Sequence, residues 1–77
     1  MTQIEKKLNK LPSKFRKRIS GFKYTFELLI KKEDDTIWVL SYKSKEYDTI
    51  FIEISHESLQ AAVDTMLSEL KKVKIIQ

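Results

Sequence analysis

The sequence predicts a small α+β domain in the order α-β-β-β-α, with a three-stranded antiparallel meander packed by a C-terminal amphipathic helix and a basic N-terminal helical segment. Three observations predict it: apolar residues at helical spacing near both ends, a two-residue alternation over residues 22–31, and short polar turns between the strand-like segments. The 77 residues suit one domain near the lower size limit for an unaided core. We divide it into a basic helical segment, residues 1–20, and a sheet with its helix, residues 21–77.

The first segment contains the only proline and the only glycine of the chain, Pro12 and Gly21. Its apolar residues recur every three or four positions, at Ile4, Leu8, Leu11, Phe15 and Ile19. This spacing indicates one face of a helix, which Pro12 interrupts. We therefore expect a short helix to about Asn9 or Lys10, a second turn-rich helix that opens at Pro12, and Gly21 as its left-handed C-cap.

Three strands are expected next. Residues 22–31 place Phe22, Tyr24, Phe26, Leu28 and Ile30 on one face. After the acidic turn 33–35, residues 36–43 are rich in β-branched and aromatic side chains and predict a hairpin partner. Residues 47–54 predict a third strand, with Ile50, Ile52 and Ile54 on its buried face. The buried face of strand 36–43 stays open between Trp38/Leu40/Tyr42 and Ile37/Val39.

The last element is an amphipathic helix. Ser55 is the expected N-cap, and a set of apolar residues follows at helical spacing. We expect Leu67 to face the core fully. Residues 73–77 are either a frayed end or a short fourth strand.

Positive charge gathers at the N-terminal end of the chain. Residues 1–23 carry a formal charge of +7 and residues 24–77 carry −3, which together give the +4 of the whole chain. Phosphate contact needs lysine and arginine on an accessible face, which this segment offers. A solvated helix face explains the same charges, and contact with a membrane surface is a third alternative. The expected nucleic-acid-contacting residues are Lys6, Lys7, Lys10, Lys14, Arg16, Lys17 and Arg18.

A second candidate surface is the open face of the sheet. Its expected members are Leu29, Ile37, Val39, Tyr47 and Phe51. An apolar centre with lysines around it favours stacking of bases, contact with another protein, pairing with a second copy of the chain, or cover by the N-terminal helix. We keep these alternatives open, and a homodimer is one of them.

No residue set resembles a reaction centre. His56 has no nucleophile or second titrating group that the sequence places beside it, and the acidic turns lack the spacing of a cation site. With no cysteine and no apolar leader, we expect a cytoplasmic protein without metal or cofactor. The function expected is binding and not catalysis: nucleic-acid contact, or alternatively a protein–protein module such as a phage or mobile-element accessory protein, an inhibitor or an antitoxin-like regulator.

Two resemblances are at the level of the fold. The α-β-β-β-α order resembles the double-stranded RNA-binding domain, but Ser55-His56-Glu57-Ser58 lacks the lysines with which that family grips phosphates. From Lys23 to Lys72, a strand, an acidic turn, a strand with Trp38-Val39, a third strand and a helix resemble the N-domain of HicB-type antitoxins. The Pro-Gly-Cys segment of that family is missing, so neither resemblance implies a function.

Overall fold

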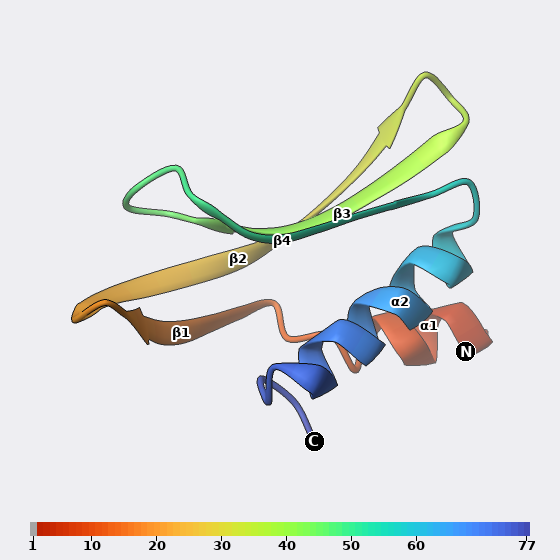
Figure 1. Ribbon diagram of the computed structural model, residues 1–77. Coiled ribbons are helices and arrows are strands. Elements are labelled where there is room, and N and C mark those ends of the chain that lie inside the picture. Colours follow the sequence, from red (N-terminus) through yellow and green to blue (C-terminus); the bar gives the residue numbers. More distant parts are fainter. Residues whose placement is uncertain (1) are drawn as a thin grey trace.

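The computed structural model describes residues 2–77 and shows a four-stranded antiparallel sheet with both helices on one side (Figure 1). In chain order the elements are α1 (Gln3–Leu8), β1 (Lys14–Ile19), β2 (Phe22–Glu33), β3 (Ile37–Ser44), β4 (Ile50–His56) and α2 (Leu59–Lys72). The strands lie in the order β1-β2-β3-β4. The α+β class is confirmed, but the order is α-β-β-β-β-α. We call the two faces of the sheet the helix side and the open face.

The additional strand, β1, occupies the segment where the apolar spacing predicts a second helix. It pairs antiparallel with β2, starting with Lys14 opposite Glu27. The spacing misleads because four residues make about one helical turn and also two repeats of a strand, so Phe15 and Ile19 share a face in either structure. The prediction of a basic helix between Pro12 and the glycine is therefore wrong.

The turn between β1 and β2 explains the only glycine. Ser20 has φ 50° and Gly21 has φ 85°, so both central residues of this two-residue connection are left-handed. Two positive φ angles are the geometry of a type I′ hairpin turn, which matches the twist of the flanking strands. Gly21 closes a hairpin and does not cap a helix. The extra strand also removes the α-β-β-β-α order on which the likeness to double-stranded RNA-binding domains depended.

Helix α1 is the short first helix that the sequence predicts, and it lies beside α2 (Figure 1). Its N-cap is Thr2, whose Oγ1 accepts a hydrogen bond from the backbone N–H of Glu5 at 3.3 Å. The hydroxyl of Thr2 also donates to the Glu5 carboxylate at 2.9 Å, so two hydrogen bonds join the N-cap to the first turn. On the opposite side of α1, Lys7 Nζ lies 3.0 Å from Asp64 Oδ1 of α2, so an ion pair joins the two helices.

Strands β2 and β3 form a long hairpin, in register from Phe26 opposite Ser44 to Glu33 opposite Ile37. Its tip is the acidic turn, in which Asp34 and its neighbour at position 35 have φ angles of 51° and 57°. Aspartate tolerates this left-handed region better than most residues because its short polar side chain can hydrogen-bond locally.

The register also settles which face of β3 is buried. Trp38, Leu40 and Tyr42 lie on the helix side, where Leu40 and Tyr42 have no exposed surface. Ile37 and Val39 lie on the open face. Of the two alternatives that the sequence left open for this strand, the protein adopts the one with Trp38, Leu40 and Tyr42 on the buried face.

Strand β4 begins three residues later than the sequence suggests, and its pairing with β3 is irregular beside Tyr42. A bulge-like irregularity turns adjacent side chains out of simple alternation. Phe51 consequently lies on the helix side, with its ring centroid 5.4 Å from that of Phe15 and 5.1 Å from that of Phe26. Ile50, expected inside, is 49% exposed on the open face. Both placements correct the sequence-based expectation.

Helix α2 is capped by Ser58 and not by Ser55, which belongs to β4. The Ser58 hydroxyl accepts from the backbone N–H of Ala61 at 3.3 Å. The buried stripe of α2 consists of Ala62, Val63, Met66 and Leu70. Leu67 lies at the margin of this stripe and is only half-buried, so the expectation that it faces the core fully is wrong.

The chain after α2 forms a compact cap. Lys74 has φ 60°, and its N–H donates to the carbonyl of Lys71 at 3.1 Å, while the N–H of Ile75 donates to the carbonyl of Leu70 at 2.9 Å. These two bonds define a Schellman motif with lysine at the left-handed position. Ile75 then packs against the core. Residues 73–77 therefore form neither a frayed end nor a fourth strand.

The core lies between the helix side of the sheet and the two helices. Its buried members are Leu11, Phe26, Leu40, Tyr42, Ile54, Ala62, Val63, Met66 and Leu70. Tyr42 keeps its one polar atom satisfied, because its hydroxyl donates to the carbonyl oxygen of Pro12 at 2.7 Å. Within residues 2–77, no helix has the length and apolar character that crossing a bilayer demands.

Candidate nucleic-acid interface

The seven basic residues expected to contact nucleic acid fall into two groups and do not share one face. Lys6, Lys7 and Lys10 lie on or just after α1, on the helix side, and Lys7 is paired with Asp64. The other four, Lys14, Arg16, Lys17 and Arg18, lie on β1. Because side chains alternate along a strand, Lys17 points to the helix side with Phe15 and Ile19, while its neighbours point to the open face.

A basic strip results at one corner of the open face. Lys14, Arg16 and Arg18 are exposed and occupy alternate positions of β1. The hairpin turn brings Lys23 of β2 directly opposite Arg18. We call these four residues, Lys14, Arg16, Arg18 and Lys23, the basic strip. Lys23 counts toward the positive N-terminal charge in the sequence but was not among the expected nucleic-acid-contacting residues, although Ser20-Gly21 was a signal that the chain folds back there.

The basic strip has no carboxylate partner among the described residues. The ion pairs of residues 2–77 involve other lysines, and the acid nearest in register, Glu27 opposite Lys14, is 3.6 Å from Lys45 Nζ. Like charges directly opposite each other on adjacent strands destabilise a hairpin. Arg18 and Lys23 are such a pair, so an anion bound between them would relieve their repulsion.

The strip is carried by a two-stranded ribbon that projects beyond the rest of the sheet. Strand β1 pairs with residues 22–27 of β2, whereas the pairing of β2 with β3 starts only at Phe26 (Figure 1). Residues 22–25 therefore have a strand neighbour on one side only. On the helix side, Phe15 anchors the ribbon, with its ring centroid 5.4 Å from Phe26 and 5.0 Å from Tyr42.

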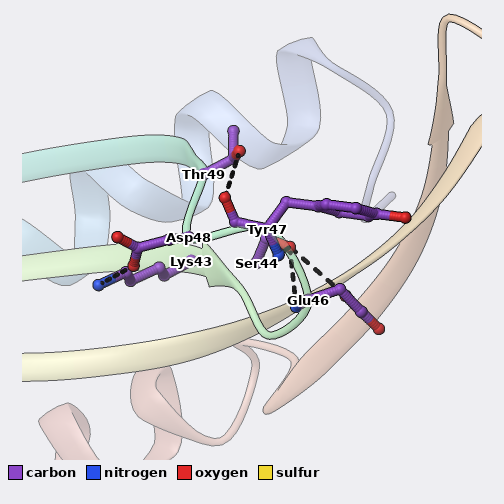
Figure 2. A network of polar contacts seen from close by, with 6 residues as sticks. All are labelled: Lys43, Ser44, Glu46, Tyr47, Asp48 and Thr49. Atoms are coloured by element: carbon purple, nitrogen blue, oxygen red, sulfur yellow. Dashed lines mark hydrogen bonds and ion pairs between the residues drawn. The ribbon is translucent and has the colours of Figure 1, made fainter.

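The turn between β3 and β4 supports the ribbon where β3 ends (Figure 2). Ser44 Oγ accepts the backbone N–H groups of Glu46 and Tyr47 at 3.2 and 3.1 Å, which holds the turn closed. The Glu46 carboxylate accepts the backbone N–H of Thr25 at 3.2 Å, and the N–H of Lys45 donates to the carbonyl of Thr25 at 3.0 Å. The side-chain oxygen of Glu46 thus accepts the hydrogen bond that a backbone carbonyl of β3 would accept if the β2–β3 pairing continued past Phe26.

This arrangement shifts the titration of Glu46. The hydrogen bond from the Thr25 backbone N–H holds the pKa of the Glu46 carboxyl below its ordinary value, and the hydroxyl of Ser44 adds to the effect. The same turn carries Tyr47, which the sequence placed on the open face. Its ring instead stands edge-on to Tyr24, with centroids 5.1 Å apart, beside the start of β2.

Next to the basic strip, the open face has a shallow hollow of about 210 Å³. Its lining comes from β2, β3 and β4: Leu29, Lys31, Glu33, Val39, Ser41, Lys43, Ile50 and Glu53. Val39 forms the floor and is only 8% exposed although no helix covers it. The open face holds three of the five residues expected there, Leu29, Ile37 and Val39, and Ile50 joins them. Phe51 instead packs against the core.

The remaining candidates for chemistry form no constellation. His56 Nε2 lies 3.1 Å from Thr65 Oγ1, a contact between β4 and α2, and both residues lie far along the sheet from the strip. Across residues 2–77, no group of three or more histidine, cysteine, aspartate or glutamate side chains is arranged to hold a metal ion.

The comparisons with known proteins add no relative. No protein-family model, no curated protein and no solved structure matches this chain. Function is therefore inferred from the geometry of the chain itself.

Proposed function

We propose that this protein binds the phosphate backbone of duplex DNA through the basic strip. The observation that supports it most directly is the placement of Lys14, Arg16, Arg18 and Lys23 on one exposed face of a hairpin with no carboxylate partner in residues 2–77. Alternate residues of a strand stand about 6.8 Å apart, so the strip presents a row of separate cations and not one clustered charge. Such rows suit successive phosphates, whose neutralisation drives most non-specific binding.

A duplex fits the hairpin better than a single strand does. Single-strand binders stack bases on aromatic side chains that project from a sheet. In this protein the aromatic residues of the strands belong to the helix side: Phe15, Phe22, Tyr24, Phe26, Trp38, Tyr42 and Phe51. The open face therefore offers phosphate contacts without a stacking platform.

B-form DNA fits better than RNA. Its major groove, about 12 Å wide, admits a two-stranded β-ribbon, whereas the major groove of A-form RNA is too narrow for side chains to enter. The projecting β1–β2 hairpin has the form of such a ribbon. Protection of an edge strand by charge also explains bases on β1, but it does not require Lys23 of β2 to join Lys14, Arg16 and Arg18 on the same face.

Fluorescence anisotropy with a labelled DNA duplex tests the proposal. Four phosphate contacts give a slope of about −3.6 for log K against log salt, so affinity falls on the order of 100-fold between 50 and 200 mM salt. The strip variant replaces Lys14, Arg16, Arg18 and Lys23 by Gln. The matched control replaces Lys6, Lys10, Lys71 and Lys74 by Gln, which removes the same charge from exposed positions elsewhere.

We expect the strip variant to lose duplex binding and the control to keep most of it. Equal losses of duplex affinity in both variants would mean that binding depends only on net charge, which would contradict a site on the hairpin. An absence of wild-type binding at 50 mM salt would reject the proposal. Tighter binding to a single strand of the same length would contradict the choice of duplex.

A second candidate function, contact with another protein, is favoured by the apolar hollow beside the strip. Leu29 and Ile50 are 47% and 49% exposed, and they flank Val39 at its floor. An exposed group of apolar side chains with a polar border is characteristic of an interaction surface. The accessory, inhibitory or regulatory roles expected from the sequence would use this surface.

A further inference from the structure

We propose that the open face is the interface between two copies of this chain, related by a two-fold axis that runs along β3. This inference rests on the second candidate function, the use of the open face as a protein contact. The apolar centre of the interface is the open-face cluster, which we define as Leu29, Ile37, Val39 and Ile50.

The shape of the molecule leaves the open face as surface to be covered. The accessible surface of the chain is 5550 Å², whereas a compact monomer of its mass exposes about 4,900 Å². The molecule is broad and thin, with principal extents of 38 × 29 × 19 Å. Its broad side has room for the roughly 800 Å² that each partner buries in a specific interface.

The charges around the cluster select a second copy as the partner. The border of the hollow carries two bases, Lys31 and Lys43, and two acids, Glu33 and Glu53. A partner surface of one sign would leave half of these charges opposed by like charge. A second copy brings the same two bases and two acids, and an axis along β3 places Lys31 of each copy near Glu53 of the other. Lys43 lies on β3 and therefore beside the axis, where the Asp48 carboxylate, 2.6 Å from its Nζ, offsets the charge that it presents to Lys43 of the other copy.

The strand order fixes which residues meet. With the axis along β3, strand β2 of one copy lies over β4 of the other. Lys31 is opposite Val39, which is opposite Ser55, and Glu53 is the next residue of β4 on the same face. Lys31 of one copy is therefore offset along the strands from Glu53 of the other by one same-face step, about 6.8 Å, and the facing sheets are about 10 Å apart. The two Cα atoms are then about 12 Å apart, a span that these two long side chains bridge. Symmetry makes this contact twice.

The Lys31–Glu53 contact separates this axis from the other two-fold axis in the plane of the sheet. An axis across the strands would place β2 over β2 and β4 over β4, so Lys31 of one copy would not face Glu53 of the other. With the axis along β3, β1 lies two strands from β3 whereas only β4 lies on the other side. Strand β1 then has no strand of the second copy over it. The dimer leaves both basic strips uncovered, about 19 Å apart at four strand spacings.

Sedimentation velocity from 1 to 100 µM, with four charge reversals, tests the inference. The wild type should form a dimer. Lys31→Glu and Glu53→Lys should each weaken it by about tenfold or more, because each sets like charges together twice. An equimolar mixture of the two variants should dimerise again, because in the mixed dimer each position 31 faces a position 53 of opposite charge. Control reversals on the helices, Lys6→Glu and Glu69→Lys, lie on the other side of the sheet and should change nothing.

Each outcome tests a different part of the proposal: the second copy, the open face or the axis along β3. A wild type that stays monomeric at 100 µM overturns the second copy as occupant but leaves the open face as a contact for another protein. A dimer that survives both reversals uses a different surface, which overturns the inference and removes its support for the second candidate function. Restoration in the mixture supports the axis along β3, because only a reciprocal contact rescues two variants that fail alone. The DNA titration of the wild type decides the first proposed function independently.

Discussion

The two faces of the sheet come from the same four strands but differ in what they collect. The helix side packs aromatic rings of the strands together, and Phe15, Phe26 and Phe51 have centroids within 5.4 Å of one another. The open face has cations at one corner and, at its centre, a small hollow with Val39 at its floor. The helix side therefore supplies the core, whereas no helix covers the open face.

The largest expected effect contrasts two leucines, one on each face. Leu40 on β3 has no exposed surface, whereas Leu29 on β2 is 47% exposed. Leu40→Ala should lower the free energy of unfolding by about 2–5 kcal/mol, because it removes buried methyl groups and leaves a cavity. Leu29→Ala should cost about 1 kcal/mol or less in the monomer.

Urea unfolding at a low and a high protein concentration measures both costs. If the open face is a dimer interface, the cost of Leu29→Ala should increase with protein concentration while that of Leu40→Ala does not, since association stabilises only the folded chain. Equal costs at the lowest concentration would show that the two faces do not differ as described.

Some strands of this sheet could be predicted from the sequence and others could not. Strand β2 was predictable because Phe22, Tyr24, Phe26, Leu28 and Ile30 occupy every second position, a period that the strand structure satisfies and a helix does not. The segment before it was not, because Phe15 and Ile19 are four residues apart and Lys17 breaks the alternation between them. A spacing of four fits a helix turn and two strand repeats alike, so only the pairing with β2 decides.

The open face was predictable only in part, for a reason of register. Leu29 follows from simple alternation on β2, whereas alternation on β3 groups Ile37 with Val39 without deciding which face is buried. Phe51 and Ile50 exchange faces because the pairing of β4 is irregular, and a single shifted residue reverses which side chains point inward. The amino-acid composition carries no signal for such an irregularity. The charge of the sequence therefore predicts a basic surface, but it does not predict which basic residues share a face or which apolar residues lie beside them.

An intermediate effect is expected at Tyr42, the one polar side chain among the fully buried large ones of the helix side. Its hydroxyl donates to the carbonyl of Pro12 at 2.7 Å and so ties the segment before β1 to β3. Tyr42→Phe should cost about 0.5–1.5 kcal/mol in urea unfolding, because it leaves that carbonyl without its donor. Tyr47→Phe is the control, since Tyr47 is 56% exposed, and it should be close to neutral.

Burial also raises the pKa of the Tyr42 hydroxyl far above its ordinary value of 10.0. The folded state thus holds this proton more tightly than the unfolded state does, so its contribution to stability is complete below pH 10.0 and is lost as the pH rises above that value. Ultraviolet titration should show Tyr42 ionising only as the protein unfolds. Ionisation of all three tyrosines together near the ordinary pKa would contradict its burial.

The smallest effect is expected at Glu46, which joins the projecting hairpin to the body of the sheet. The Thr25 backbone N–H lowers the pKa of the Glu46 carboxyl below its ordinary value of 4.5. A carboxyl with a lowered folded pKa stabilises the protein above its unfolded pKa, and that contribution is lost as the pH falls through the folded pKa. Carbon-13 NMR should therefore show the Glu46 carboxyl titrating below pH 4.5.

Glu46→Gln tests what this charge does for the hairpin. The amide oxygen can still accept the Thr25 N–H, but without the charge the bond is weaker. The melting temperature of the variant should lie slightly below that of the wild type at pH 7, and the difference should shrink as the pH falls below 4.5. Glu57→Gln, at an exposed position before α2, should show no such convergence. A difference that stays constant down to pH 3 would mean that the Glu46 charge does not hold the ribbon. The attachment of β1 and its basic strip would then rest on the packing of Phe15 and Ile19 against the core and on the Lys45–Thr25 hydrogen bond.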